Sequence, residues 1–353
     1  MSIHKIHIET VIENLEQYLI IDVRSEGEYF LAHIPTSISL PIFNNEERKI
    51  IGTSYKKDSR ENAIKLGLNF FGPKMTHFIA EMEEILQQQN GKKIVLHCWR
   101  GGMRSSAMAW LFNFYGIEIS LLEGGYKAYR NWCLEQFKKD YPIAIISGCT
   151  GAAKTEIIDA LDKENYSTID LEAIACHKGS AFGYLGMPSQ PTQEYFENQL
   201  ALHFFIEMNK QPDFIFIEDE SQRIGNLQIP NDLWATIKTK NRYFFDIPFE
   251  DRLQHIVAEY SVFNKEELIA CIHRITKNLG GLNAKNCIQF IEENKISECF
   301  RILLQHYDKA YIKGIQKNEN WEKITFQIIS ENSDPIENSK KLKEIITKKC
   351  QQK

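Results

Sequence analysis

The sequence predicts an α/β protein of two domains, and three observations lead to this fold class. The chain has 353 residues, which is longer than one typical domain and short for three. Its first third, to about residue 130, alternates strand-like and helix-like stretches, as parallel sheets covered by helices do. A second alternating series begins at IAIISG, residues 143–148. We therefore expect one parallel-sheet domain at 1–136 and a second α/β domain, with a mostly helical C-terminal region, at 137–353.

The elements follow in a consistent order. In the first domain the strand-like stretches YLIIDVRS, HIPTSISLP, KKIVLHC and ISLL are separated by charged or long helical stretches. In the second domain IAIISG is followed by YSTIDLE, PDFIFIEDES and NRYFFDIP, and the sequence beyond Pro248 is mostly helical and charged. The stretch near residue 137 is neither long nor low in complexity, so a compact junction is expected there. Functional loops are expected at the carboxyl ends of the strands.

Composition excludes several classes of protein. The chain is 43% hydrophobic and 25% charged, which is typical of a globular protein with a sizeable core. It has no signal-like N-terminus and no apolar run of the roughly 18 residues that a membrane helix needs, so a cytoplasmic location is expected. Eight cysteines without CxxC pairs argue against structural zinc and a disulfide scaffold. The net charge of −5 means that any contact with nucleic acid must come from a local basic patch.

The stretch HCWRGGMRS, residues 97–105, directly follows the apolar run KKIVL. A thiol reacts as thiolate, and a glycine-rich turn into a helix flanked by two arginines lowers the pKa of a cysteine. Cys98 is therefore the predicted nucleophile, and Arg100 and Arg104 the predicted catalytic cations. Trp99, Gly101 and Gly102 are expected to help form an anion cradle. Two chemistries fit this loop, namely phosphate-ester hydrolysis and transfer of a chalcogen atom carried on the cysteine.

The loop satisfies HCxxxxxR and so also resembles the cysteine-dependent phosphatases. Such an enzyme protonates its leaving group, usually with a carboxylic acid on the loop or near it. Between Cys98 and Arg104 the loop has no acid, and it carries a bulky Trp99 and a second arginine. This favours transfer over hydrolysis, although an acid from a distant loop would restore the phosphatase alternative.

SGCTGAAKT, residues 147–155, follows a strand and opens a helical run, which is the context of a phosphate-binding loop. Gly148 and Gly151 would let backbone N–H groups face an anion, Lys154 adds a charge, and Thr155 could hold magnesium. The usual glycine before the lysine is Ala153, which is tolerated if that residue has helical dihedral angles. Further on, PDFIFIEDES ends in acids, and Glu218 or Asp219 could order the magnesium. A phosphate-bearing ligand is expected, without ATP being established.

Three segments of the first domain resemble the rhodanese domain, whose cysteine carries a persulfide or its selenium equivalent. They are DVRS at 22–25, HIP at 33–35 and the cysteine loop, with Thr36 where the family usually has glycine after HIP. The resemblance implies that Asp22 and Arg24 support the loop, and an ion pair between them is expected as well. For His97 we expect a structural role, with its side chain directed away from Cys98.

Several longer segments resemble tRNA 2-selenouridine synthase, a family that joins a rhodanese domain to a P-loop domain. They are NEERKIIGTSYKKDSRENAIKLGLNFFGPK, LHCWRGGMRSSAMAWLF, LEGGYKAYR, IDLEAIACHKGSAFGYLGMPSQPTQEYFEN, IEDESQRIG and HYDKAY, in that order between about residues 20 and 311. The resemblance implies an enzyme that replaces the sulfur of wobble 2-thiouridine with selenium. Selenophosphate and geranyl diphosphate would be its substrates, through an S-geranyl intermediate, with no tightly bound cofactor.

The resemblance also implies partners and site residues. The partner would be a tRNA of the Lys, Glu or Gln type, and an enzyme that supplies selenophosphate is a possible second one. Asp170, Glu172, His177, Lys178, Ser180 and Phe182 are expected to line a diphosphate site with the phosphate-binding loop. Basic residues beside tyrosines suggest an RNA-facing surface, although tyrosines are as often core residues. They are Lys56 and Lys57 after Tyr55, Lys127 after Tyr126, and Arg130 after Tyr129. A P-loop ATPase or kinase with a rhodanese binding module remains the other alternative.

Overall fold

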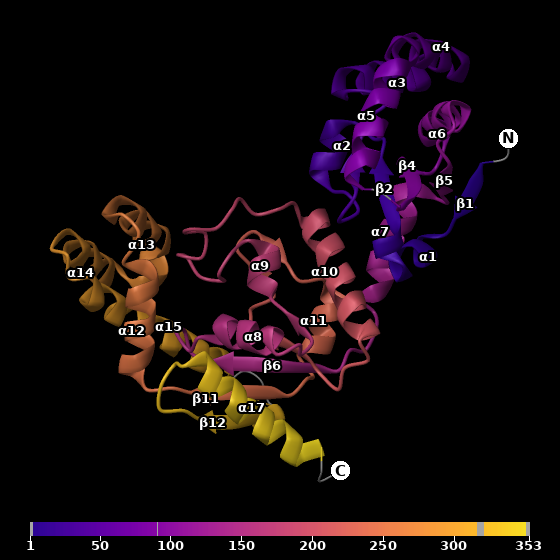
Figure 1. Ribbon diagram of the computed structural model, residues 1–353. Helices are drawn as coiled ribbons and strands as arrows, with labels where there is room; N and C mark the ends of the chain where they lie inside the picture. The colour runs from indigo at the N-terminus through magenta and orange to yellow at the C-terminus, as the bar shows by residue number, and fades with distance from the viewer. Residues whose placement is uncertain (1–2, 90, 316–320, 351–353) are drawn as a thin grey trace. The chain divides into compact units, whose positions relative to one another are not determined.

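A computed structural model describes residues 3–89, 91–315 and 321–350. The chain divides into two compact units, Met1–Phe137 with Glu197–Leu202, and Lys138–Phe196 with His203–Lys353 (Figure 1). Each unit is built on a parallel five-stranded sheet, and the second contains a largely helical region, so the predicted fold class is confirmed. Within the described ranges no helix combines the length and the apolar character needed to cross a membrane.

The first unit has the strand order β1-β5-β4-β2-β3. Its strands are β1 (His4–Ile6), β2 (Tyr18–Asp22), β3 (Ile38–Ser39), β4 (Lys93–His97) and β5 (Ile119–Leu122). Its α-helices are α1 (Ile8–Glu13), α2 (Glu26–Leu31), α3 (Asn45–Lys57), α4 (Arg60–Phe71), α5 (Met75–Gln88), α6 (Met103–Tyr115) and α7 (Gly125–Gln136). Two 3-10 turns, η1 (Leu15–Gln17) and η2 (Gly72–Lys74), precede β2 and α5.

The register of the central strands positions the functional loop of this unit. In the parallel pair β2 and β4, Asp22 lies opposite His97 at the carboxyl ends of the strands. The residues that follow, Val23 and Cys98, are both buried, and they belong to one apolar core with Leu96 and Phe112. The cysteine loop therefore begins at the buried centre of the sheet, where its first residues are held by the strands.

The second unit has the strand order β12-β11-β6-β8-β7 and a separate antiparallel hairpin, β9 with β10. Its strands are β6 (Ile143–Gly148), β7 (Thr168–Ile169), β8 (Ile215–Glu218), β9 (Arg223–Ile224), β10 (Leu227–Gln228), β11 (Arg242–Asp246) and β12 (Thr325–Ile329). The helices that precede β11 are α8 (Lys154–Lys163), α9 (Leu171–Ala175), α10 (Gln193–Asn209) and α11 (Asn231–Ile237). Those that follow are α12 (Phe249–Tyr260), α13 (Lys265–Leu279), α14 (Gly281–Glu292), α15 (Ile296–Ile315), α16 (Trp321–Ile324) and α17 (Pro335–Cys350).

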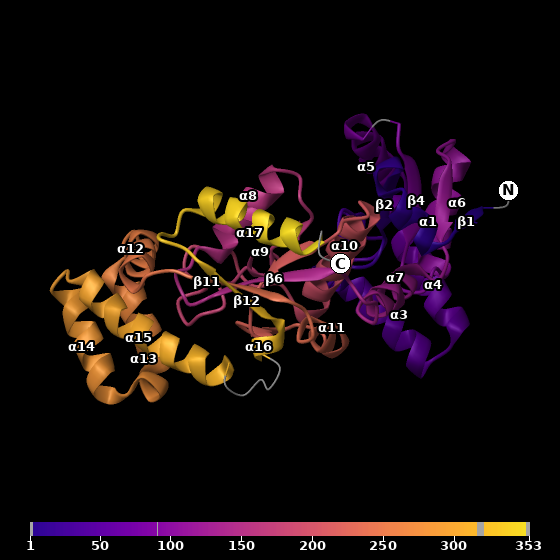
Figure 2. The ribbon, with the colours of Figure 1, turned by 90° about the horizontal axis from the view of Figure 1, so that it is seen from below.

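Helices α12 to α15 form a group of their own within the second unit. Figures 1 and 2 show this group gathered beside the carboxyl end of β6, whereas α17 lies along α8. The four helices share an apolar core that includes Leu253, Leu268, Cys287 and Leu303. Phe182, from the segment after α9, is buried in the same core, so this segment is anchored to the helical group.

Two details differ from the sequence prediction. The stretch beyond Pro248 contains a strand as well as helices, because β12 pairs in parallel with β11 at the edge of the sheet. Only Ile328 of β12 is fully buried, whereas Ile329 is 78% exposed, so the strand lacks the strong apolar run that would identify it. In HIPTSISLP only Ile38–Ser39 forms a strand.

Candidate functional site

Cys98 directly follows β4, and the cysteine loop (residues 98–104) leads into α6. The side chain of Cys98 is only 4% exposed. Its Sγ lies 3.3 Å from the backbone N–H of Gly102 and 3.3 Å from Oγ of Ser105, and both groups donate to it. Gly101 has φ +65°, and a Cβ there would lie 2.8 Å from the carbonyl oxygen of Leu122. Only glycine fits this turn, because a side chain would meet the backbone that follows β5.

These contacts set the acidity of the thiol. Burial alone would raise the pKa of Cys98, but the hydrogen bonds from Ser105 and Gly102 and the charge of Arg104 outweigh it and lower the pKa. The thiolate is the nucleophilic form, so the loop holds Cys98 ready to react. Burial raises the pKa of Cys133 to about 12 and that of Cys149 to about 11, which marks these thiols as inert by comparison.

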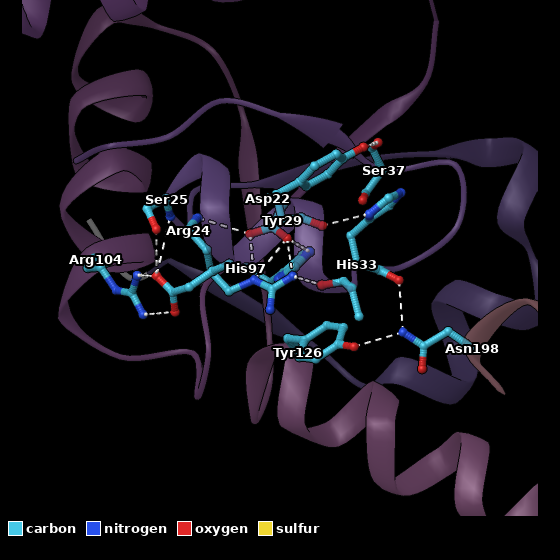
Figure 3. Close-up of polar contacts among 12 residues, drawn as sticks. Asp22, Arg24, Ser25, Tyr29, His33, Ser37, His97, Arg104, Tyr126 and Asn198 are labelled. Atoms are coloured by element: carbon cyan, nitrogen blue, oxygen red, sulfur yellow. Dashed lines mark hydrogen bonds and ion pairs between the residues drawn. The ribbon is translucent and has the colours of Figure 1, made fainter. Parts of the chain in front are cut away.

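The two predicted arginines of the loop differ in their surroundings. Arg104 forms a forked ion pair with Glu28, with Nη1 2.6 Å from Oε2 and Nη2 3.2 Å from Oε1 (Figure 3). Glu28 is also 3.3 Å from Nε of Arg48, and it completes the cap of α2 at Ser25. Arg100 is exposed and forms no ion pair with another described residue. An incoming anion therefore meets Arg100 directly but competes with Glu28 for Arg104.

Behind the loop lies a buried group of polar side chains (Figure 3). Asp22 Oδ2 is 2.6 Å from Nη2 of Arg24, which also donates to the carbonyl oxygen of Ala32 at 2.7 Å. The Arg24 guanidinium lies 3.9 Å from the ring centroid of Tyr126. His97 Nε2 is 3.8 Å from Asp22, and burial lowers the pKa of this imidazole. The expected ion pair is present, and His97 lies among these buried groups.

The predicted RNA surface divides into exposed and buried residues. Lys56, Lys57 and Lys127 are exposed. Of the two alternatives for Tyr126 and Tyr129, base stacking is wrong and the core alternative is confirmed, because both side chains are fully buried. Their hydroxyl groups contact Asn198 of α10, at 2.7 Å for Tyr126 and 2.9 Å for Tyr129. Arg130 is likewise paired, with Glu197.

In the second unit the phosphate-binding loop (residues 147–155) connects β6 to α8. Gly151 has φ +83°, and a Cβ there would lie 2.7 Å from the carbonyl oxygen of Arg252. Ala153 has φ +53° and ψ +38°. The condition under which alanine is tolerated, helical dihedral angles, is not met, because Ala153 takes the left-handed conformation that favours glycine. An alanine there costs about 1–2 kcal/mol of backbone strain.

The helical group holds the phosphate-binding loop in place. Arg252 of α12 donates to the carbonyl oxygen of Thr150 at 3.0 Å. Its guanidinium also forms a forked ion pair with Asp308 of α15, at 3.0 and 2.8 Å. From the same stretch of α15, Tyr311 lies 2.7 Å from Oγ of Ser147. Two residues of the HYDKAY stretch, Asp308 and Tyr311, thus support the loop although they are far from it in sequence.

A cavity of about 1160 Å³ opens beside this loop. Many of the predicted residues line it, namely Gly148, Gly151, Lys154, Thr155, Glu172, Lys178, Ser180 and Phe182. Three predicted residues do not line it. Asp170 instead caps α9 by accepting from the N–H of Ala173 at 2.7 Å, His177 is buried, and Glu218 is buried behind Glu172.

Three carboxyl groups lie together here, with Glu172 and Glu220 lining the cavity and Glu218 buried next to Glu172. Glu218 accepts from the N–H of Glu172 at 2.8 Å, and the Thr155 hydroxyl donates to Glu172 at 3.2 Å. Burial and the neighbouring Glu220 raise the pKa of Glu172 to about 8, and burial also raises the pKa of Glu218 and of Glu220. Carboxyl groups of raised pKa keep protons near neutral pH, so the negative charge of these three residues is reduced. A reduced charge is compatible with an anion bound at Lys154.

Comparison with known proteins agrees with this arrangement. A family model described as a rhodanese-like domain matches residues 8–131, and one described as a tRNA 2-selenouridine synthase AAA domain matches residues 141–332. The chain is 34% identical to the tRNA 2-selenouridine synthase of Nitrosomonas eutropha, with 85% of this chain and 89% of that protein covered. Its identity to the tRNA 2-selenouridine synthase of Shewanella frigidimarina is also 34%, with 89% and 92% covered.

The chain belongs to the tRNA 2-selenouridine synthase family. It is an enzyme of this type, and the family resemblance seen in the sequence is confirmed. Two positions where it lacks the glycine expected from the motifs are Thr36 and Ala153. Both keep a positive φ, +73° and +53°. A positive φ at a residue other than glycine stores backbone strain, so both positions are strained.

Sequence reasoning missed several residues of this tRNA 2-selenouridine synthase family member. Ser105 was identifiable, since it directly follows the arginine of HCxxxxxR and contacts Cys98 from the first turn of α6. Glu220 also lines the cavity and belongs to the acidic end of PDFIFIEDES. Asp219 of that stretch, which the sequence did single out, lines the cavity and accepts from Ser147 at 2.6 Å and from Tyr311 at 3.1 Å. No local pattern links Arg252 to Thr150, because 102 residues separate them in the chain.

Proposed function

We propose that this enzyme replaces the sulfur of wobble 2-thiouridine in tRNA with selenium through an S-geranyl intermediate. The observation that carries the proposal is that each unit has a glycine-rich loop between a parallel strand and a helix, β4 to α6 in one and β6 to α8 in the other. The cysteine loop holds a thiol of lowered pKa, and the phosphate-binding loop opens on a large cavity. Each loop suits one of the two anionic substrates, selenophosphate and geranyl diphosphate.

In the first step the base sulfur attacks C1 of geranyl diphosphate, the C1–O bond breaks, and pyrophosphate leaves as N3 of the base loses its proton. Lys154 lines the cavity at the start of α8, where its charge would stabilise the departing pyrophosphate. Thr155 and Glu172 line the same cavity, and the Thr155 hydroxyl donates to Glu172. These two residues would hold a magnesium ion, which would displace the Glu172 proton and neutralise charge on the diphosphate.

In the second step selenium of selenophosphate attacks C2 of the base, and the geranyl thiolate leaves and takes up a proton. Water then cleaves the Se–P bond, which releases phosphate and leaves 2-selenouridine. A thiolate is a better leaving group than a doubly bonded sulfur, which is the chemical reason for the first step. Cys98 would position the selenophosphate for this attack, because its Sγ is hydrogen-bonded within the cysteine loop. Arg100 is exposed and available to bind selenophosphate, with Arg104 held nearby through Glu28.

The alternatives fit these surroundings less well. A phosphatase needs a carboxylic acid beside the cysteine loop. Glu28 contacts the loop through Arg104. Burial alone would raise the pKa of Glu28, but the contact with Arg104 outweighs burial and lowers the pKa. The Glu28 carboxylate is therefore ionised and a poor proton donor. For an ATPase, the strained Ala153 replaces the glycine that nucleotide-binding loops normally have.

The tRNA would be held by a local basic surface, because the net charge of the chain is −5. Lys56, Lys57 and Lys127 are its exposed candidates. Affinity for 2-thiouridine tRNA should fall with rising salt, and Lys56→Ala with Lys57→Ala should reduce the slope of log affinity against log salt by about 2. Filter binding over a salt series measures this, and an unchanged slope in the double variant would remove these lysines from the tRNA surface.

The reaction itself is tested by mass spectrometry of the nucleosides of a 2-thiouridine tRNA. With enzyme and geranyl diphosphate alone, the expected product is S-geranyl-2-thiouridine, and adding selenophosphate should convert it to 2-selenouridine. Cys98→Ala should still geranylate but yield no selenouridine. Full selenouridine yield from this variant, or selenation by wild type without any geranylated species, would contradict the proposal.

A further inference from the structure

The cavity beside the phosphate-binding loop has an apolar side that its diphosphate-binding role does not explain. This side, which we call the apolar wall, is formed by α12, α15 and the segment after α9. Its residues are Phe182, Ile256, Tyr260, Phe300, Leu303 and Leu304. We propose that the apolar wall binds the hydrocarbon chain of an isoprenoid diphosphate and that Phe182, Tyr260 and Phe300 set the longest chain accepted. This inference rests on the proposed geranyl transfer.

The wall and the phosphate-binding loop are in direct contact. A Cβ placed on Gly151 would lie 2.9 Å from Cγ1 of Ile256, so the turn of the loop packs against α12 at this residue. Arg252, one helical turn earlier on α12, donates to the loop at Thr150. A ligand whose phosphates are held by the loop thus has apolar side chains immediately beside it. This is the arrangement that an anionic head joined to a hydrocarbon tail requires.

Three rings close part of the wall. The ring centroids of Phe182 and Tyr260 are 5.7 Å apart, those of Phe182 and Phe300 are 5.6 Å apart, and those of Tyr260 and Phe300 are 5.5 Å apart. All three side chains are buried and belong to the core of the helical group. Because packed cores resist displacement, this ring cluster forms a firm boundary and not a surface that yields to a longer chain.

The charges near the wall are already balanced. Lys178, which also lines the cavity, is paired with Glu259 and lies 5.9 Å from the ring centroid of Tyr260. His255 is 3.1 Å from Glu156. A nucleoside in this position would need free hydrogen-bonding partners, whereas a hydrocarbon needs none. Each carbon buried on the wall is worth roughly fourfold in affinity.

Binding of the chain is measured first, with inorganic pyrophosphate and geranyl diphosphate as ligands of the wild-type enzyme in titration calorimetry. The wall predicts that geranyl diphosphate binds at least 100-fold more tightly than pyrophosphate. Equal affinities would overturn the proposal, because the hydrocarbon chain would then contribute nothing to the binding free energy.

Chain length is measured next, as the ratio of kcat/KM for transfer from farnesyl and from geranyl diphosphate to 2-thiouridine tRNA. Phe300→Leu should raise this ratio about tenfold or more, and Leu304→Phe, which fills the cavity, should lower it. Phe290→Leu is the matched control, because Phe290 packs on the same helical core but does not line the cavity. Melting temperatures identify any variant that fails to fold.

The outcomes separate this inference from the function on which it rests. If wild type transfers no isoprenoid group to the tRNA, the proposed function itself fails. If wild type geranylates but folded Phe300→Leu and Leu304→Phe both keep the wild-type ratio, the proposed function stands and the ring cluster is not the length boundary. An equal change in the Phe290→Leu control would likewise overturn the assignment to the wall.

Discussion

Oγ of Ser105 lies 3.3 Å from Sγ of Cys98 and donates a hydrogen bond to it. The same hydroxyl is 3.1 Å from the carbonyl oxygen of Gly102, so its one proton is shared between two acceptors. Ionisation of the thiol draws this proton to sulfur, because an ionised acceptor makes the stronger hydrogen bond. Ser105 is therefore a positioning residue that stabilises the thiolate without taking part in group transfer.

Removing this hydroxyl should raise the pKa of Cys98. The thiolate, and with it the rate of alkylation, increases as pH rises through the pKa, so Ser105→Ala should move the inflection to higher pH. Iodoacetamide labelling of Cys98 across a pH series, read by peptide mass spectrometry, measures it. Ser105→Thr keeps the hydroxyl and should restore the wild-type profile. An inflection unmoved in Ser105→Ala would show that the thiolate does not depend on this contact.

The Asp22–Arg24 ion pair should stabilise the first unit. Asp22→Asn leaves the buried Arg24 without a charged partner, which costs about 3–5 kcal/mol of unfolding free energy. Burial alone would raise the pKa of Asp22, but His97 and Arg24 outweigh it and lower the pKa. A lowered pKa means that this stability is present above about pH 4, the ordinary range of an aspartate, and is lost as pH falls.

Urea unfolding of wild type and Asp22→Asn at several pH values measures the effect. The difference should be largest near neutral pH and should narrow in acid. Glu250→Gln, which breaks an exposed pair with Arg301, serves as the control and should leave the unfolding midpoint nearly unchanged. A difference that grew on acidification would mean that folding raises the pKa of Asp22 instead of lowering it.

Glycine at the two strained positions should stabilise the protein. Ala153→Gly and Thr36→Gly each remove a side chain from a left-handed residue, which should add about 1 kcal/mol of unfolding free energy. Ala152→Gly is the control, because Ala152 is buried beside Ala153 without a positive φ and should lose stability. Thermal unfolding compares the three variants, and destabilisation by Ala153→Gly would mean that its backbone is not strained.

The fold class and the positions of the cysteine loop and the phosphate-binding loop could be predicted because they depend on local sequence patterns. Alternating strand-like and helix-like stretches identify parallel sheets, and glycine-rich turns after a strand identify loops. The edge strand β12 is the exception, since its exposed residues give no clear alternation. The left-handed conformations of Thr36 and Ala153 could be inferred only from where glycine is expected.

The parts that could not be predicted depend on long-range packing. Tyr311 meets Ser147 across 164 residues, and Arg252 meets Asp308 across 56. Tyr126 and Tyr129 are a different case, because a local pattern in the sequence indicates that they belong to the core. Tyr126, Tyr129 and Trp132 recur every three residues along α7, which is the spacing of a buried helix face.

The central claim is that the two loops divide the reaction, and Lys154→Ala tests it most directly. Losing this charge should lower the rate of geranylation about 10²-fold or more, because the contact strengthens as negative charge develops on the departing pyrophosphate. Lys154→Arg is the matched control for folding and charge.

The deciding measurement is the 2-selenouridine yield of Lys154→Ala when it is given selenophosphate and tRNA that already carries S-geranyl-2-thiouridine, read by nucleoside mass spectrometry. If the phosphate-binding loop serves only geranyl transfer, the variant should selenate this tRNA at the wild-type rate, while Cys98→Ala should not. If folded Lys154→Ala fails to selenate the pre-geranylated tRNA, the division of the reaction between the two loops is contradicted.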